Sequence, residues 1–155
     1  MPKAATPEGR MGAYKSLSDV PRRHRLSTFV ESYRDRDVWG EFLAQEVLPG
    51  ISYERKIEDV HRYGRYWKEH TDSNGTHHAL ATPEVVESYS EWLIEDKTPI
   101  TACLYWVRVD DFYEWLLWHA DHPHRYNPVR MAAVEYENAG TLWEWQYQNH
   151  GGRDL

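Results

Sequence analysis

The segment that follows Thr98-Pro99 carries apolar side chains around most of its circumference when it is drawn as a helix. One stripe, at steps of three and four residues, consists of Ala102, Tyr105, Val109, Phe112 and Leu116. A second stripe beside it consists of Cys103, Trp106, Tyr113 and Leu117. Helices that are apolar on so many sides are normally enclosed by other helices. The pattern therefore predicts a central helix that ends near His119, and a buried structural role for Cys103.

Local start and stop signals predict further helices around this one. Asp37 can cap a helix over residues 37–48 that ends at Pro49-Gly50. Ser52 is the expected N-cap of a helix that reaches His70. Thr82-Pro83-Glu84 starts another, because Thr caps, Pro suits the first position and an acid favours the positive end of the dipole. Thr98-Pro99 repeats this start signal for the central helix. A last helix is expected over residues 129–138, stopped by Gly140.

The remaining segments set the expected domain limits. Residues 71–81 have the composition of a loop, and the alternation of Trp143, Trp145 and Tyr147 fits a strand as well as a helix. We expect a basic flexible arm over residues 1–26, a helical domain over 27–130, and a C-terminal helix, tail or linker over 131–155. The fold class is all-α, with four to five helices.

The composition indicates the cellular location of the protein more clearly than its function. The single cysteine excludes an internal disulfide and agrees with a reducing, cytoplasmic location. No apolar run is long enough for a transmembrane helix, and the polar N-terminus lacks a signal peptide, so no membrane partner is expected. Thirteen Arg against five Lys, with an acidic balance, are typical of proteins adapted to concentrated salt.

The net charge of −7 is unevenly distributed. Residues 1–25 have a net charge of +4, so the other 130 residues have a net charge of −11. An acidic chain does not by itself indicate nucleic-acid binding. The run Arg22, Arg23 and Arg25 could still contact phosphates, or it could be a solvated tail.

Three landmarks occur in an order that resembles a known family. The first is Asp59-Val60 followed by Tyr63 and Trp67, and the second is Thr82-Pro83-Glu84 leading to Tyr89, Trp92 and Leu93. The third is Phe112-Tyr113-Glu114-Trp115-Leu116, followed by Asn127-Pro128. Together they resemble the N-terminal core-binding domain of tyrosine recombinases, the phage-integrase family, over roughly residues 37–130. The third landmark is the most specific of the three.

The resemblance implies a SAM-like helical bundle that forms half of a clamp around a recombination site, with double-stranded DNA as the partner. The helices over 52–70 and 99–119 would face the DNA, and that face needs Arg or Lys to neutralise phosphates. The candidate DNA-binding residues are Arg55, Lys56, Arg62, Arg65, Lys68 and Arg108, with Arg22, Arg23 and Arg25 from the arm. A solvated basic helix face is the alternative interpretation. Asp110-Asp111 departs from the family, which commonly has basic residues there.

Catalysis is not expected from this chain. The family's nucleophilic Tyr and its activating Arg, Lys and His groups belong to a domain that starts after the Asn-Pro landmark, and only 27 residues follow Pro128. His122-Pro123-His124-Arg125 matches a bare His-x-x-Arg pattern but precedes that landmark. We therefore predict no catalytic residue, no cofactor and no metal, although His119, His122, His124 and Asp121 could in principle supply metal ligands.

Two functions remain open at this level. The first is a DNA-binding module of a recombinase or mobile element, which grips DNA while another domain or protein cuts it. The second is a helical protein-interaction module, or self-associating module, that has lost DNA binding. Asp110-Asp111 and the abundant Trp and Tyr favour the second function.

Overall fold

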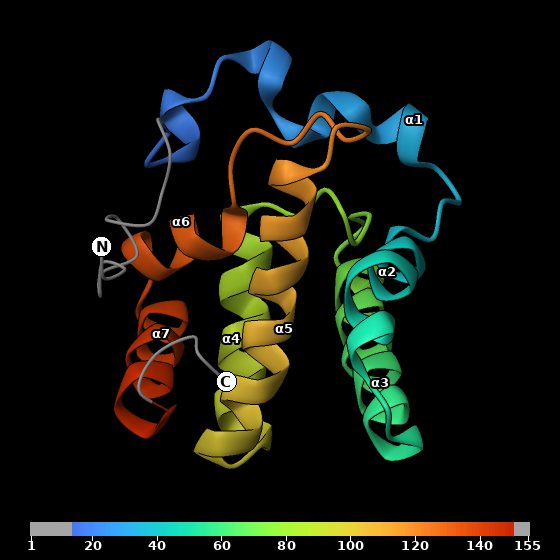
Figure 1. The fold of residues 1–155 in the computed structure, drawn as a ribbon. Helices are drawn as coiled ribbons and strands as arrows, with labels where there is room; N and C mark the ends of the chain where they lie inside the picture. The colour runs from blue at the N-terminus through green and yellow to red at the C-terminus, as the bar shows by residue number, and fades with distance from the viewer. Residues whose placement is uncertain (1–13, 151–155) are drawn as a thin grey trace, which may run out of the picture.

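The computed structural model describes residues 14–150, and these residues form helices without any strand (Figure 1). The helices are α1 (Val30–Tyr33), α2 (Val38–Phe42), α3 (Glu54–Ser73), α4 (Pro83–Asp96), α5 (Pro99–Trp118), α6 (Pro128–Glu135) and α7 (Glu137–His150). Short 3₁₀ turns cover Leu17–Asp19, Arg22–His24, Leu26–Phe29 and Leu48–Gly50, and a π-helical turn covers Leu43–Val47. The all-α class predicted from the sequence is confirmed.

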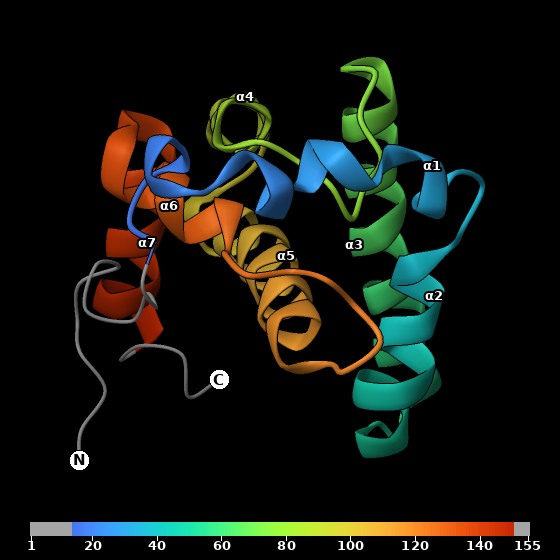
Figure 2. The same cartoon turned by 90° about the horizontal axis from the view of Figure 1, so that it is seen from above.

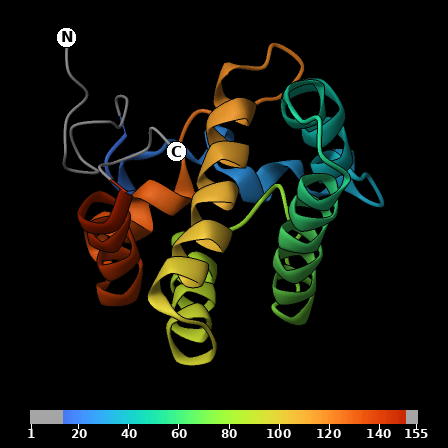
Figure 3. The same cartoon turned by 60° about the horizontal axis from the view of Figure 1, so that its bottom comes forward.

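Helix α5 is the centre of the structure, as its two apolar stripes predict. It packs against α2, α3, α4, α6 and α7. Both stripes are buried except for the last residue of the second, Leu117, which is half-buried. Figure 3 shows α5 as a ridge between α7 on one side and α3 with α2 on the other. Cys103 is buried within it, as expected, and burial raises the pKa of its thiol to about 11.

Predicted capping residues begin three of the helices. The side chains of Asp37, Thr82 and Thr98 accept backbone N–H groups at the starts of α2, α4 and α5. A polar side chain at this position satisfies one of the N–H groups that have no partner within the helix. The prediction of Ser52 as a cap is wrong, because α3 follows Tyr53 and has no side-chain cap.

The C-terminal segment belongs to the core, which corrects the domain limit drawn at residue 130. Helices α6 and α7 pack on α4 and α5, and Met131, Leu142 and Trp143 are buried. Gly140 does not stop a helix but lies inside α7. A Cβ at Gly140 would meet the Ala133 carbonyl oxygen at 3.1 Å, so the glycine lets α6 and α7 approach closely. The ambiguous tail is helical to His150.

The described part of the expected arm is docked on the bundle. Figure 2 shows residues 17–33 crossing one end of the bundle, from the side of α6 to that of α3. Val20 and Leu26 are buried, and the Leu26 N–H donates to the Tyr126 hydroxyl at 2.8 Å. Residues 1–13 of the expected arm lie outside the described residues. The free arm predicted over 1–26 is therefore wrong for residues 17–26.

None of the helices between residues 14 and 150 has the length and apolar character that crossing a bilayer requires.

Gly64 allows α3 to pack against Trp39. A Cβ at this position would overlap three atoms of the Trp39 indole. That ring is buried, and its centroid lies 5.0 Å from that of Phe112, so it cannot move away from the added Cβ. We expect Gly64→Ala to lower the free energy of unfolding by about 1–3 kcal/mol, as overpacking does, although Ala favours helices. Urea denaturation measures this change in the free energy of unfolding.

The matched control is Gly50→Ala, because a Cβ at Gly50 meets nothing within 4 Å. This variant should change stability by less than about 0.5 kcal/mol. A Gly64→Ala protein that is more stable than the parent would contradict the packing described for Trp39.

Candidate nucleic-acid interface

Helix α3 carries five of the nine basic residues that the sequence singles out. Arg55, Lys56 and Arg65 are exposed and form no ion pair within residues 14–150. Helix α3 has 20 residues, so it is about 30 Å long. These three side chains are the cations of α3 that remain available to an external anion.

The other two basic residues of α3 already have carboxylate partners. The Arg62 guanidinium donates to Asp59 at 2.8 Å and to the Tyr105 hydroxyl at 3.0 Å, and these hydrogen bonds raise its pKa further above its ordinary value. The Lys68 ammonium lies 2.5 Å from an Asp37 carboxylate oxygen. Helix α3 also carries as many acids as bases, namely Glu54, Glu58, Asp59, Glu69 and Asp72.

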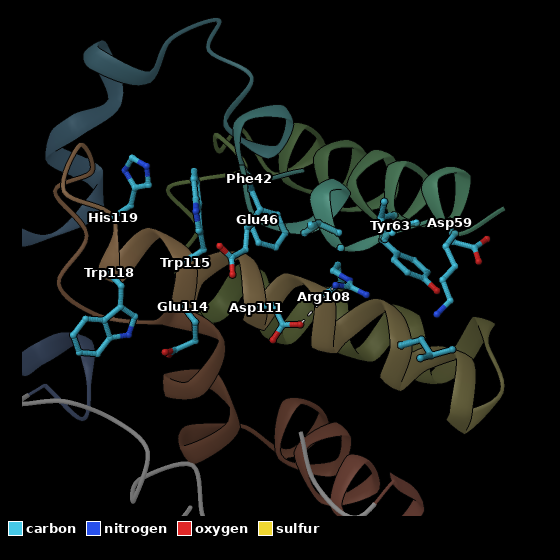
Figure 4. A pocket seen from close by; sticks show the side chains of 16 residues that line it. Phe42, Glu46, Asp59, Tyr63, Arg108, Asp111, Glu114, Trp115, Trp118 and His119 are labelled. Carbon is cyan, nitrogen blue, oxygen red and sulfur yellow. Dashed lines mark ion pairs between the residues drawn. The ribbon is translucent and has the colours of Figure 1, made fainter. Parts of the chain in front are cut away.

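The remaining four candidates lie elsewhere. Arg108 lines a groove between α3 and α5, 4.0 Å from Asp111, and burial lowers its pKa from the ordinary value (Figure 4). Arg22 and Arg23 are exposed on a turn at one end of the bundle, whereas α3 begins at the opposite end (Figure 1). Arg25 donates to the Val20 carbonyl at 3.0 Å. The nine residues therefore do not form one continuous basic surface.

The two acids that depart from the family pattern have different environments. Asp110 is 0% exposed and accepts hydrogen bonds from Asn127 at 2.7 Å and from Arg130 at 3.3 Å. Glu114, one turn further along α5, binds the same guanidinium at 3.1 Å. Asp110 is thus part of a buried ion-pair network, and only Asp111 reaches the surface of the groove.

The Asp110 network connects the third landmark to the start of α6. The Asn127 side-chain oxygen accepts the Val129 N–H at 2.9 Å, while its amide group donates to Asp110. Sequence reasoning missed Arg130 and its role. The available signal was the pair Asp110 and Glu114, four residues apart on one face of a buried helix, which calls for a buried cation.

The outward face of α5 is apolar where the resemblance implies phosphate contacts. Ile100 is 54% exposed, Leu104 39% and Trp118 85%. Asp111 and Glu114 share this side of the helix. Large exposed apolar side chains on a charged protein indicate an interaction surface more than a phosphate-binding one.

A groove separates this face from α3 and from the turn that follows α2. It has a volume of about 1000 Å³ and is lined by 16 residues, of which Figure 4 labels ten. Phe42, Tyr63 and Trp115 contribute apolar side chains to its lining, and Glu46 and Asp59 contribute carboxylates (Figure 4).

A group of histidines lies between the N-terminal segment and the loops. The Tyr33 ring lies 5.7–5.8 Å from the rings of His77, His122 and His124, and its hydroxyl is 2.5 Å from His122 Nδ1. His124 Nε2 is 2.6 Å from the Ala79 carbonyl oxygen. Among residues 14–150 no three His, Cys, Asp or Glu side chains are grouped as metal ligands would be. These rings contribute to packing and backbone hydrogen bonding.

No protein family, curated protein or solved structure matches this chain.

The Asp110 network predicts a large difference between two adjacent acids. Asp110→Ala leaves the buried Arg130 with one carboxylate partner fewer, and losing one member of a buried ion pair costs about 3–5 kcal/mol. Asp111→Ala removes a half-buried acid 4.0 Å from Arg108, and should cost less than about 1 kcal/mol. Denaturant unfolding of both variants checks this, and equal losses would contradict the buried role of Asp110.

Buried histidines predict that stability falls in weak acid. Burial lowers the pKa of His78 to about 3 and that of His124 to about 4, from an ordinary value of 6.5. Below about pH 6.5 the unfolded chain therefore binds protons that the folded chain does not. Stability should be complete above that pH and fall as the pH drops towards about 4, with a slope approaching 2.7 kcal/mol per pH unit for two protons.

Urea midpoints measured across this range test the slope. Replacing His124 by Gln removes one of these protons, so it should reduce the slope by up to about 1.4 kcal/mol per pH unit. A pH-independent midpoint between neutrality and about pH 5 would contradict the depressed pKa values.

Proposed function

We propose that this chain is a helical DNA-binding module similar to the core-binding domain of tyrosine recombinases. The observation that carries the proposal is the set of exposed cations Arg55, Lys56 and Arg65 on α3, which lack ion-pair partners within the described residues. The module would hold recombination-site duplex while another domain or protein performs the cleavage.

The spacing of these cations suits a duplex. Arg55 and Arg65 are ten residues apart on one helix, which corresponds to about 15 Å. The major groove of B-DNA is about 12 Å wide, so a helix of this length can contact the phosphates on both of its edges. Contacts of this kind set orientation and affinity but not sequence preference.

The acids on α5 oppose DNA binding less than their sequence suggests. Asp110 is buried and neutralised by Arg130, so it does not face an approaching phosphate. Asp111 shares its surroundings with Arg108. The order of the three landmarks, with Asn127 joining the last of them to α6, supports the proposal further.

The charge balance of α3 limits the expected affinity. Five acids accompany its five bases, so three available cations carry most of the phosphate neutralisation. We expect weak binding to short labelled duplexes in fluorescence anisotropy at low salt. The logarithm of the binding constant should fall against the logarithm of salt concentration with a slope of about −3, close to 0.9 per phosphate.

The matched variants are Arg65→Glu and Arg34→Glu. Both change the charge equally, and Arg34 is exposed at the end of α1, where it pairs with Glu31, and does not belong to α3. Arg65→Glu should weaken binding several-fold and reduce the slope, whereas Arg34→Glu should not change the slope. Absence of binding at low salt, or equal losses in the two variants, would overturn the proposal.

A second candidate function is the docking of another protein. The observation that favours it is the apolar outward face of α5, with Ile100, Leu104 and Trp118 exposed. Exposed aromatic and aliphatic side chains of this kind are enriched at protein interfaces.

A further inference from the structure

The groove between α3 and α5 has the form of a binding site for a helix. Its floor contains the buried side chains Phe42, Val47 and Val60, together with Tyr63 from α3 and Trp115 from α5 (Figure 4). Leu104 and Trp118 stand at its α5 edge with much of their surface exposed. An amphipathic helix binds to such a groove through apolar residues spaced at three and four positions.

The length of the groove defines the size of its occupant. Its α5 edge runs from Leu104 to Trp118, fourteen positions apart, which corresponds to about 21 Å. A helix of about 14 residues, or four turns, covers that length. The volume of about 1000 Å³ is sufficient for a row of three or four large apolar side chains.

The charged residues that line the groove determine which charge a partner should carry. Carboxylates come from three elements, with Glu46 after α2, Asp59 on α3, and Asp111 and Glu114 on α5. Only Lys56 and Arg108 among the lining residues are permanent cations. Asp59, Asp111 and Glu114 already face Arg62, Arg108 and Arg130 of the same chain, whereas Glu46 is exposed and forms no ion pair within the described residues. The lining has two more carboxylates than permanent cations, and Glu46 is the acid most available to a Lys or Arg at the border of an apolar stripe.

We propose that the groove between α3 and α5 docks a cationic amphipathic helix of a partner protein. The apolar stripe of that helix covers Leu104, Tyr63 and Trp115, and a Lys or Arg side chain at its border meets Glu46. The proposal extends the second candidate function and does not depend on DNA binding by Arg55 and Arg65, which lie outside the groove lining; Lys56 belongs to both surfaces.

Three synthetic peptides test it with the intact chain. The first is a labelled Leu/Lys helix of about 14 residues with its Leu on one face. The second has the same composition in an order that scatters the Leu residues, and the third is a Leu/Glu helix with the first peptide's pattern. Anisotropy titrations should give an affinity at least about tenfold higher for the first peptide than for either of the others. Equal binding of the first two would overturn the proposal.

Two groove variants and one control variant outside the groove locate the binding site. Leu104→Asp should weaken binding of the Leu/Lys peptide by about tenfold or more, whereas Val30→Asp, at a similarly exposed apolar residue of α1, should leave it unchanged. Glu46→Lys, at an exposed position, should weaken the Leu/Lys peptide and strengthen the Leu/Glu peptide. Equal effects of Leu104→Asp and Val30→Asp would overturn the proposal.

Other occupants of the groove would give different results. If a second copy of this chain fills the groove, sedimentation shows a dimer that Leu104→Asp dissociates. If duplex DNA fills it, unlabelled duplex displaces the peptide, and Leu104→Asp also weakens DNA binding. Either result overturns the proposal. A DNA affinity that Arg65→Glu reduces and Leu104→Asp does not change shows that the two surfaces are separate, as proposed.

Discussion

The structure depends on a buried stretch of loop, residues 77–81, whose backbone polar groups must all be satisfied. Loops normally run over the surface, because buried N–H and C=O groups without partners are costly. Here the His78 carbonyl accepts hydrogen bonds from Trp67 of α3 at 2.9 Å and from Tyr113 of α5 at 2.8 Å. The Tyr113 hydroxyl also accepts the Ala81 N–H at 3.0 Å. Two helices are thus joined through one loop residue.

The same loop holds the beginning of α2 and the segment after α5. The His78 ring accepts the N–H groups of Val38 and Trp39 at 3.2 Å, which requires a neutral imidazole, and burial keeps its pKa far below the ordinary value. This arrangement explains the use of Trp and Tyr in the core, since each ring fills space while one polar atom reaches a backbone partner. The hydrogen bonds to the His78 carbonyl also hold α3 beside α5, so the groove between these helices is part of the fold.

Local patterns in the sequence were enough to predict the central helix and three capping residues, but not the tertiary partners. Thr82 and Thr98 act on backbone groups three residues away, so their role can be recognised locally. The availability of the candidate cations depends on residues distant in sequence, since Lys68 is neutralised by Asp37 and Arg62 is held by Tyr105. The prediction that Gly140 ends a helix is also wrong, because the glycine allows two helices to pack closely there. DNA binding stays a prediction.

The distribution of charge connects the two proposed surfaces. Several basic residues form ion pairs with acids of the same chain, including Arg36 with Glu41 and Arg130 with Asp110, which leaves few cations for external phosphates. Of those that remain on α3, Arg55 and Arg65 lie outside the groove and Lys56 lines it, opposite an edge that is apolar and acidic. One helix can therefore present cations to a duplex on its outer side while its inner side contributes Asp59 and Tyr63 to a protein-binding groove. Because like charges exclude the wrong partner from each surface, an acidic groove next to a basic helix face would let DNA and a cationic protein bind to the same domain without competing.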